Sequence, residues 1–315
     1  MKMEEAMKKR ALLSLFVLLA LVITLAATAV ANAAALPNEC AQCGQAVTWT
    51  GLSTVADDTA ELAAGHYYYD YAESSHSFTA VKEISGKVCL YIPAGKTLSG
   101  PTRVFTVTKT GELSVMGEGT LAGIGYTEHE KGGTIVVNGG ILNLLGGTLT
   151  SNLAQDRLVF QGGVVYMNGG TFNMSGGSVE NGKTNSTLSS TNGANGGNVC
   201  MDGSSVLNMT GGTIKDGTVS GNKYGAGGNL YMNTSAKANV SGGSITGGSA
   251  RVGGGNCVNC RGVFTISGDA VVEGLRPSPI SSKSVYDTFA ISGEFTGSVN
   301  VLLTDGALKA GEALA

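Results

Sequence analysis

Charged residues are scarce in this chain. Asp, Glu, Lys and Arg together make up 14% of its 315 residues, and the formal net charge is −3. No basic stripe runs through the sequence, so it lacks the electrostatic footprint of a protein that binds nucleic acid or an anionic membrane surface. We therefore expect no nucleic-acid partner.

Carboxylates are missing where a sugar-cleaving enzyme would need them. A glycosidase places two Asp or Glu about 5 to 10 Å apart around the bond that it cleaves, and a calcium-dependent lyase gathers oxygen ligands beside a basic residue. The strand faces inferred below carry almost no Asp or Glu. One charged cluster, Glu128 to Lys131, falls in a loop, where a solvated turn is the more common outcome. We expect no enzymatic activity, no metal and no cofactor.

Glycine, in contrast, is abundant, with 49 residues, and much of it belongs to one repeated phrase. The phrase consists of two glycines, a short alternating strand, a polar turn, a second alternating strand and two more glycines. Counting a degenerate first copy, about six copies are present. They lie at 104–115, 132–147 and 162–177, and begin again near Gly196, Gly227 and Gly254.

Alternation within each copy predicts the architecture, because successive side chains of a strand point to opposite faces. A third apolar position follows the closing glycines. Three short strands per copy, with corners turned by Gly or Asn, predict one coil of an all-β, parallel β-helix or solenoid. The third inward positions are Leu121, Leu149, Val179, Ile214, Ile245 and Val271, and the first-strand exterior is Thr106, Val136, Tyr166, Cys200, Tyr231 and Val258.

One outward position of the second strand is polar in every copy. Equivalent residues of successive coils stack at about 4.8 Å, the spacing of paired strands. The repeat therefore predicts a structural ladder of polar side chains on one outer face. Its members are Asn143, Asn173, Asn208 and Asn239, with Ser114 before them and Thr265 after them.

The segments around the repeat have separate roles. Residues 1–33 are predicted to be a signal peptide, since Lys8-Lys9-Arg10 precedes a long apolar run and Ala31-Asn32-Ala33 supplies a small-x-small cleavage pattern. Residues 34–84 are predicted to form a β-rich N-terminal cap, residues 85–274 the β-helix, and residues 275–315 a short β-rich segment that is truncated. We expect a secreted or cell-surface protein, with a membrane contact only if the signal peptide stays uncleaved.

Six cysteines in an exported chain raise the question of pairing. Cys40 and Cys43 precede the repeat, whereas Cys257 and Cys260 belong to its last copy. A joint zinc site is disfavoured, because about five coils would separate the pairs by roughly 24 Å. Two local sites are expected, each a disulfide or a pair of free thiols. Two further cysteines, Cys89 and Cys200, fall on outward positions with no evident partner.

Aromatic residues, only 6% of the chain, offer two candidate contact surfaces. Trp49, Tyr67 and Tyr69 either cap the open end of the β-helix or form a stacking platform for sugar rings, and the cap is favoured because large aromatics mostly bury area. Tyr166 and Tyr231 share one outward strip. They form either an aromatic groove that binds a ligand or a strip that a loop covers.

The repeat at 162–177 and its copies resembles the right-handed parallel β-helix repeats of adhesin-like surface proteins of Gram-positive gut bacteria. The opening Cys40-Ala-Gln-Cys-Gly and the Gly65-His-Tyr-Tyr strand are similar to the lead-in of such proteins. The resemblance implies a right-handed β-helix and a surface role.

Three functions follow as alternatives. The first is a non-catalytic, adhesin-like module that binds glycans or host and neighbouring proteins. The second is a polysaccharide lyase or glycoside hydrolase, since pectate lyases use the same fold. The third is a purely structural stalk, which a uniformly polar exterior would favour.

Overall fold

The structure is a computed structural model of the chain. It describes residues 36–123, 130–151, 159–186, 194–221, 225–250, 258–277 and 289–301. The expected signal peptide lies outside these residues. The chain divides into two units, Met1–Asn38 and Glu39–Ala315, and the fold described below is that of the second. Its described residues form strands, turns and one short 3-10 helix, η1 (Leu52–Thr54), and none of them belongs to a helix that could cross a membrane.

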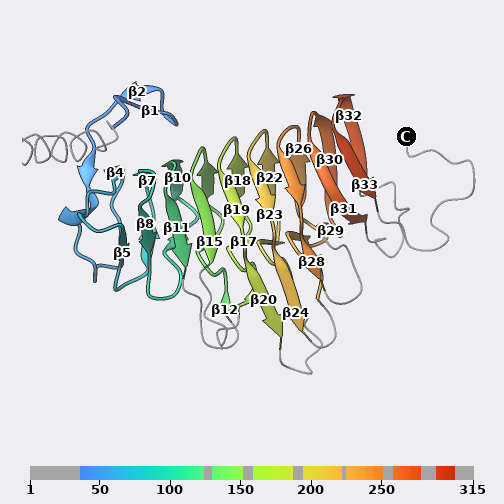
Figure 1. Cartoon of the computed structure of the whole chain (residues 1–315), viewed down its shortest axis with the longest axis horizontal. Coiled ribbons are helices and arrows are strands. Elements are labelled where there is room, and N and C mark those ends of the chain that lie inside the picture. Colours follow the sequence, from blue (N-terminus) through green and yellow to red (C-terminus); the bar gives the residue numbers. More distant parts are fainter. Residues whose placement is uncertain are drawn as a thin grey trace, which may run out of the picture. The chain divides into compact units, whose positions relative to one another are not determined.

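A ten-stranded sheet runs through this unit (Figure 1). Its strands are, in spatial order, β3 (Thr50–Gly51), β4 (Gly65–Tyr68), β7 (Lys87–Ile92), β10 (Glu112–Gly117), β14 (Ile141–Leu144), β18 (Thr171–Met174), β22 (Val206–Met209), β26 (Lys237–Val240), β30 (Val263–Gly268) and β32 (Phe289–Phe295).

A sixteen-stranded sheet consists of two halves that the long strand β31 joins. The first half contains β5 (Ser75–Ser77), β8 (Thr97–Ser99), β11 (Thr120–Gly123), β15 (Thr148–Ser151), β19 (Ser178–Glu180), β23 (Thr213–Lys215), β27 (Ser244–Thr246) and β31 (Val271–Pro277), with β33 (Ser298–Val301) paired to β31. The second half contains β6 (Lys82–Ile84), β9 (Phe105–Val107), β13 (Ile135–Val137), β17 (Val165–Asn168), β21 (Val199–Asp202), β25 (Leu230–Met232) and β29 (Val258–Cys260).

Three small sheets complete the described strands. An antiparallel hairpin joins β1 (Glu39–Cys40) to β2 (Gln45–Ala46). The other two are parallel and follow the first half of the larger sheet in the chain. They contain β12 (Glu130–Lys131) with β16 (Val159–Gln161), and β20 (Lys183–Ser186) with β24 (Thr218–Gly221) and β28 (Ser249–Ala250).

All described pairings within the two large sheets are parallel. The chain passes from β13 to β14 to β15, and then from β17 to β18 to β19. Each pass therefore visits the second half, the ten-stranded sheet and the first half in that order. The fold is all-β, parallel and solenoid-like.

The inward faces of these three rows share one hydrophobic core. Ile135, Leu142 and Leu149, one from each row, are fully buried in the same cluster. The predicted inward positions are buried in every coil except at Val271. Burying an aliphatic side chain of this size stabilises the fold by about 1.5–3 kcal/mol. Burial of the alternating apolar side chains therefore supplies the main driving force for folding of the solenoid.

Glycines turn the corner before β13, β17, β21 and β25 of the second half. Gly196 has a φ of +64°, a conformation that residues with a side chain rarely adopt. A Cβ at this position would lie 2.1 Å from the carbonyl oxygen of Val199. Gly162 and Gly227 have the same conformation in the neighbouring coils, which explains why the repeat keeps glycine at this corner.

The predicted register is wrong by one residue at two places in the last coil. Val258 pairs with Leu230 and is buried, so Asn259, the partner of Tyr231, takes the outward position. Similarly, Val272 rather than Val271 is the buried partner of Ile245. Val271 and Val272 are both apolar, so alternation alone could not choose between them.

The parallel sheets extend beyond residues 85–274. Upstream, β4 pairs with β7, and β6 pairs with β9. Downstream, β32 pairs with β30, and β33 pairs with β31. Residues on both sides of the repeat thus add strands to the same rows, although their sequences lack its double glycines.

Candidate functional site

The predicted aromatic strip is buried. Tyr166 pairs with Cys200, and Cys200 pairs with Tyr231, so these side chains project from one row as expected. Their exposed fractions are only 6%, 0% and 8%, and they pack with Val136 in a cluster separate from the main core. These side chains therefore form no open aromatic groove, and their burial agrees with the alternative of a covered strip.

Polar contacts hold Tyr166 in place beneath this cover. Lys131 Nζ lies 4.6 Å from the centre of the Tyr166 ring and 2.9 Å from its hydroxyl oxygen. That hydroxyl donates a hydrogen bond of 2.8 Å to Asp202 Oδ2. Burial raises the pKa of Tyr166, and the bond to Asp202 raises it further, so the phenol stays a neutral donor. These contacts give the strip a structural role.

The N-terminal tyrosines do not form a sugar platform either. Tyr67 and Tyr69 are 8% and 3% exposed and belong to the main core. Their hydroxyls donate to the main-chain oxygens of Ala63 and Glu73. Trp49 is half-buried, with its ring edge-on to another ring, that of His66, at a centroid distance of 5.8 Å. Tyr67 and Tyr69 thus pack in the core as a cap would, whereas Trp49 packs outside it, against the cluster of Cys40, Cys89 and Met116.

The four asparagines of the predicted ladder lie in register on the outer face of the ten-stranded sheet. Each donates from Nδ2 to the Oδ1 of the preceding one, at 2.9 Å for Asn173 to Asn143, 3.0 Å for Asn208 to Asn173 and 2.9 Å for Asn239 to Asn208. Asn143 donates in turn to Ser114 Oγ and to Glu112 Oε1, both at 3.0 Å. The row is one continuous chain of amide hydrogen bonds.

The same outer row continues upstream into two residues that can bind a metal. Ser114 pairs with Cys89, and Cys89 pairs with His66. Because parallel pairing puts equivalent side chains on one face, His66 and Cys89 occupy the first two positions of the asparagine row. No copy of the glycine-rich phrase covers these strands, so the repeat alone did not point to them.

The hairpin β1–β2 brings two more sulfur atoms to this end of the row. Cys40 pairs with Gln45 across the hairpin, and Gly44 closes the turn with a φ of +63° and a 2.8 Å hydrogen bond to the Cys40 oxygen. Gln42, within the turn, donates from Nε2 to Glu112 Oε1 at 3.3 Å. The turn is thereby held against β10.

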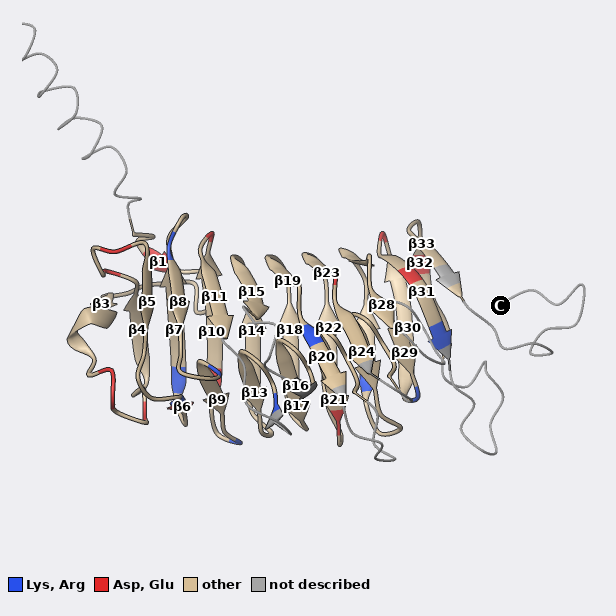
Figure 2. Ribbon diagram, turned by 60° about the horizontal axis from the view of Figure 1, so that its bottom comes forward, with Lys and Arg blue, Asp and Glu red and all other residues tan. Residues whose placement is uncertain are grey.

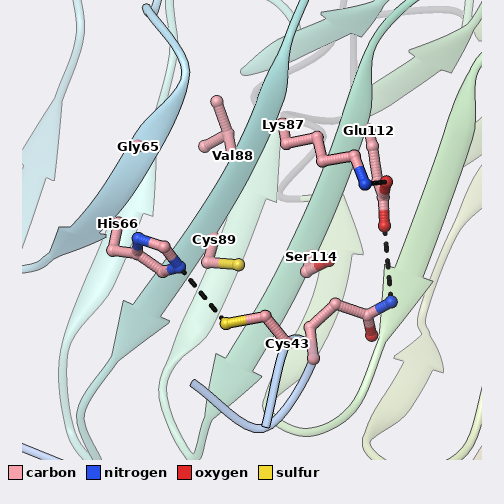
Figure 3. Close-up of a pocket in the computed structure, with 9 residues that line it drawn as sticks. Cys43, Gly65, His66, Lys87, Val88, Cys89, Glu112 and Ser114 are labelled. Carbon is pink, nitrogen blue, oxygen red and sulfur yellow. Dashed lines mark hydrogen bonds and ion pairs between the residues drawn. The ribbon is translucent and has the colours of Figure 1, made fainter. Parts of the chain in front are cut away.

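Together these segments form a cysteine–histidine cluster, in which Cys40, His66 and Cys89 make one group and Cys43 adjoins it at His66. Figure 3 shows Cys43, His66 and Cys89. The Sγ atoms of Cys40 and Cys89 lie 3.0 Å apart, and Cys43 Sγ lies 3.6 Å from His66 Nε2. The donor atoms of Cys40, His66 and Cys89 all lie within 4.8 Å of one another. Cys40 and Cys89 are buried, whereas Cys43 is exposed.

The pKa values of Cys40 and Cys89 are shifted in opposite directions. Burial raises the pKa of Cys40, but hydrogen bonds from the Cys89 side chain and from the main chain of Cys43 and Gln42 outweigh it and bring the pKa below its usual value. Burial raises the pKa of Cys89, and the neighbouring Cys40 raises it further. Of the two thiols, Cys40 is therefore the one that loses its proton more easily.

A pocket opens beside the cluster on the outer face of the ten-stranded sheet (Figure 3). Cys43, His66 and Cys89 line it together with Lys87 and Glu112, which form an ion pair of 3.5 Å. Chemically, the arrangement offers soft sulfur and imidazole donors and two thiols close enough to oxidise. It does not present the separated pair of carboxylates that glycoside hydrolysis requires.

Of the two alternatives expected for Cys40 and Cys43, a disulfide or a pair of free thiols, the structure has the free thiols. The sulfur atom beside Cys40 Sγ is that of Cys89. Cys260 is fully buried in the main core, with its Sγ 3.1 Å from the oxygen of Gly262. Its expected partner, Cys257, lies outside the described residues.

A second, buried ladder escaped the sequence analysis. Asn198 and Asn229 have no exposed area, and Asn198 Nδ2 donates to Asn229 Oδ1 at 2.8 Å. Each Oδ1 also accepts a main-chain N–H, from Gly182 at 2.7 Å and from Gly217 at 2.8 Å. The phrase Gly-Gly-Asn, which occurs at 196–198 and again at 227–229, was the available signal.

Comparisons with protein-family models, with curated proteins and with solved structures find no match to this chain. Function therefore has to be inferred from the outer row, the covered tyrosines and the cysteine–histidine cluster.

Proposed function

We propose that the chain is a non-catalytic module of a secreted or cell-surface protein, built as a right-handed parallel β-helix behind a β-rich cap. The fixed order in which the chain visits the three rows, and their common core, support a β-helix. A right-handed winding agrees with the strong preference of parallel crossover connections for that hand. The resemblance of the repeat to adhesin-like surface proteins supports the surface role.

The outer row of the ten-stranded sheet carries the proposal. From Ser114 through the four asparagines to Thr265 its members are neutral, and the amides bind one another. Since stacked positions are about 4.8 Å apart, a glycosidase pair would need carboxylates on this row or an adjacent one. Glu112, two residues before Ser114 on β10, is engaged by Lys87, Gln42 and Asn143. Figure 2 likewise shows that most of the ribbon is neither acidic nor basic.

Such a face is better suited to a structural spacer than to catalysis. Every ladder bond joins one coil to the next, so the row braces the solenoid along its length. A neutral polar surface also resists nonspecific attraction to charged polymers. The module would thus act as a stiff, inert spacer that presents whatever is attached to it.

Ligand binding by the same face is a second candidate, because two apolar side chains flank the row. Ile141 is 37% exposed and Val263 is 40% exposed, each two residues before a member of the row on its own strand. Glycans or neighbouring proteins could contact this face through apolar patches beside ordered amides. The covered tyrosines no longer contribute to it.

Two assays test these alternatives. The purified full chain is incubated with plant, algal and host polysaccharides, and new reducing ends and unsaturated uronates are measured; we expect none, and turnover of any substrate would refute the non-catalytic proposal. The chain is then applied to glycan arrays and to intact cells, with Ile141→Arg as the face variant and Ile291→Arg, at another exposed position of the ten-stranded sheet, as the control. Binding that only Ile141→Arg abolishes favours the second candidate, whereas no binding favours the spacer.

A further inference from the structure

We infer that Cys40, Cys43, His66 and Cys89 bind one Zn²⁺ ion, which fastens the hairpin β1–β2 to the ten-stranded sheet. The inference is independent of the proposed function, since it concerns four side chains that neither the ladder nor the covered tyrosines involve.

Two distances within the cluster approach those of a tetrahedral zinc site. Zn–S bonds of about 2.3 Å and Zn–N bonds of about 2.0–2.1 Å place two ligand atoms about 3.6 Å apart for S···N and about 3.8 Å apart for S···S. Cys43 Sγ and His66 Nε2 are 3.6 Å apart, which matches the first value. Cys40 and Cys89, at 3.0 Å, need to separate by about 0.8 Å, which small rotations of the two side chains supply.

The turn between the two hairpin strands presents its sulfur atoms as metal ligands. In Cys40-Ala-Gln-Cys-Gly44 two residues separate the cysteines, which is the usual spacing of paired zinc ligands. Gly44, at positive φ, allows the chain to curl in this way.

The remaining surroundings favour zinc over harder cations. Three sulfur atoms and one imidazole nitrogen suit Zn²⁺, whereas Ca²⁺ and Mg²⁺ prefer oxygen ligands. Trp49 packs against the His66 ring, and Val47 and Met116 pack in the cluster that contains Cys40 and Cys89. An apolar shell of this kind limits the access of water to the ligands.

Four protein ligands fill the tetrahedral shell and leave no open position, so the ion is structural rather than catalytic. Its ligands come from the hairpin, from β4 and from β7. The ion therefore links a short two-stranded hairpin, which would be marginal alone, to the first coils of the solenoid.

A Cys40–Cys89 disulfide is the competing outcome. It requires the sulfur atoms to approach by about 1 Å, to the bond length of about 2.05 Å. It would use two of the four side chains and give no reason for the 3.6 Å approach of Cys43 to His66. Zinc accounts for all four.

The test uses the full chain, reduced and kept free of chelators. We expect one zinc per chain by elemental analysis, and a Co²⁺-loaded sample with thiolate-to-metal charge-transfer and tetrahedral ligand-field bands. Cys43→Ser and His66→Gln should each weaken zinc binding more than about tenfold, since even outer-shell substitutions cost 10–100-fold. Cys200→Ala and His76→Gln remove a cysteine and a histidine outside the cluster and should leave affinity unchanged.

Folding is monitored in parallel. Because Cys43 is exposed, Cys43→Ser should still fold, so a loss of zinc binding in this variant reports on the ligand and not on unfolding. Zinc should raise the unfolding midpoint of the wild-type chain but not that of this variant. The inference is overturned if the reduced chain takes up no zinc, or if Cys43→Ser and His66→Gln bind it as tightly as the controls. It is also overturned if peptide mapping of the natively produced chain finds a Cys40–Cys89 disulfide and no metal.

Discussion

The asparagine ladder makes a graded prediction about stability. Asn173 takes part in two ladder bonds, donating to Asn143 and accepting from Asn208. A neutral hydrogen bond contributes a net of about 0.5–1.5 kcal/mol. Asn173 is only half-buried, so water can reach the groups that lose their partner and limit the cost. Asn173→Ala should therefore lower the free energy of unfolding by about 1–2 kcal/mol.

Position along the ladder should change this cost. Asn239 donates one ladder bond, to Asn208, and is exposed. Asn239→Ala should thus cost about half as much as Asn173→Ala, near 0.5–1 kcal/mol. The double variant Asn173→Ala/Asn208→Ala should lose less than the sum of its single variants, because both single changes remove the same bond.

Urea unfolding, followed by circular dichroism, measures these differences, with constant m-values as the check that a single cooperative transition is compared. If Asn173→Ala and Asn239→Ala lowered the free energy of unfolding equally, the ladder bonds would contribute no more stability than an exposed polar side chain does. Strict additivity in the double variant would show that the neighbouring amides are not coupled. Either result would refute the ladder as a stabilising element.

Three further substitutions probe the core, the covered strip and the cap. Met174→Asp puts a lone carboxylate at a position that is 1% exposed, which costs several kcal/mol, and should abolish cooperative unfolding in circular dichroism, whereas Met174→Leu should preserve it. Tyr166→Phe removes the hydroxyl bonded to Asp202 and should cost about 1.5–3 kcal/mol in urea unfolding; a neutral result would contradict the structural role of that bond. Lys82, fully buried, donates to three main-chain oxygens in 56–59, so Lys82→Met should cost at least about 2 kcal/mol and speed hydrogen exchange of the cap, and unchanged exchange would contradict it.

Period-two alternation was sufficient to predict the strands and their inward faces, because burial of one face leaves few other choices. Leu149 and Val179, for example, are buried as predicted. Alternation fails where a strand is short or uniformly apolar. Val271 and Val272 are such a case, and pairing with the preceding coil decides between them.

Burial of the outward tyrosines could not be predicted from the repeat, because the cover depends on contacts from outside it. Lys131 lies just before the glycines of one copy, and the repeat pattern gives no sign that its ammonium group contacts the Tyr166 hydroxyl. The cysteine–histidine cluster was missed for a different reason. Extending the outward row two strands upstream of Ser114 would have reached Cys89 and His66, but these strands lack the glycines by which the copies were aligned.

All ladder bonds point the same way along the row. Each side-chain amide has a dipole, and here the dipoles line up head to tail over successive coils, with their N–H ends toward the start of the solenoid. Aligned hydrogen bonds polarise one another, as they do in an α-helix. Glu112, whose carboxylate accepts from Asn143, lies at the positive end of this array. An uncharged face thus has an electrical polarity, and Glu112→Gln would leave its positive end without a counter-charge.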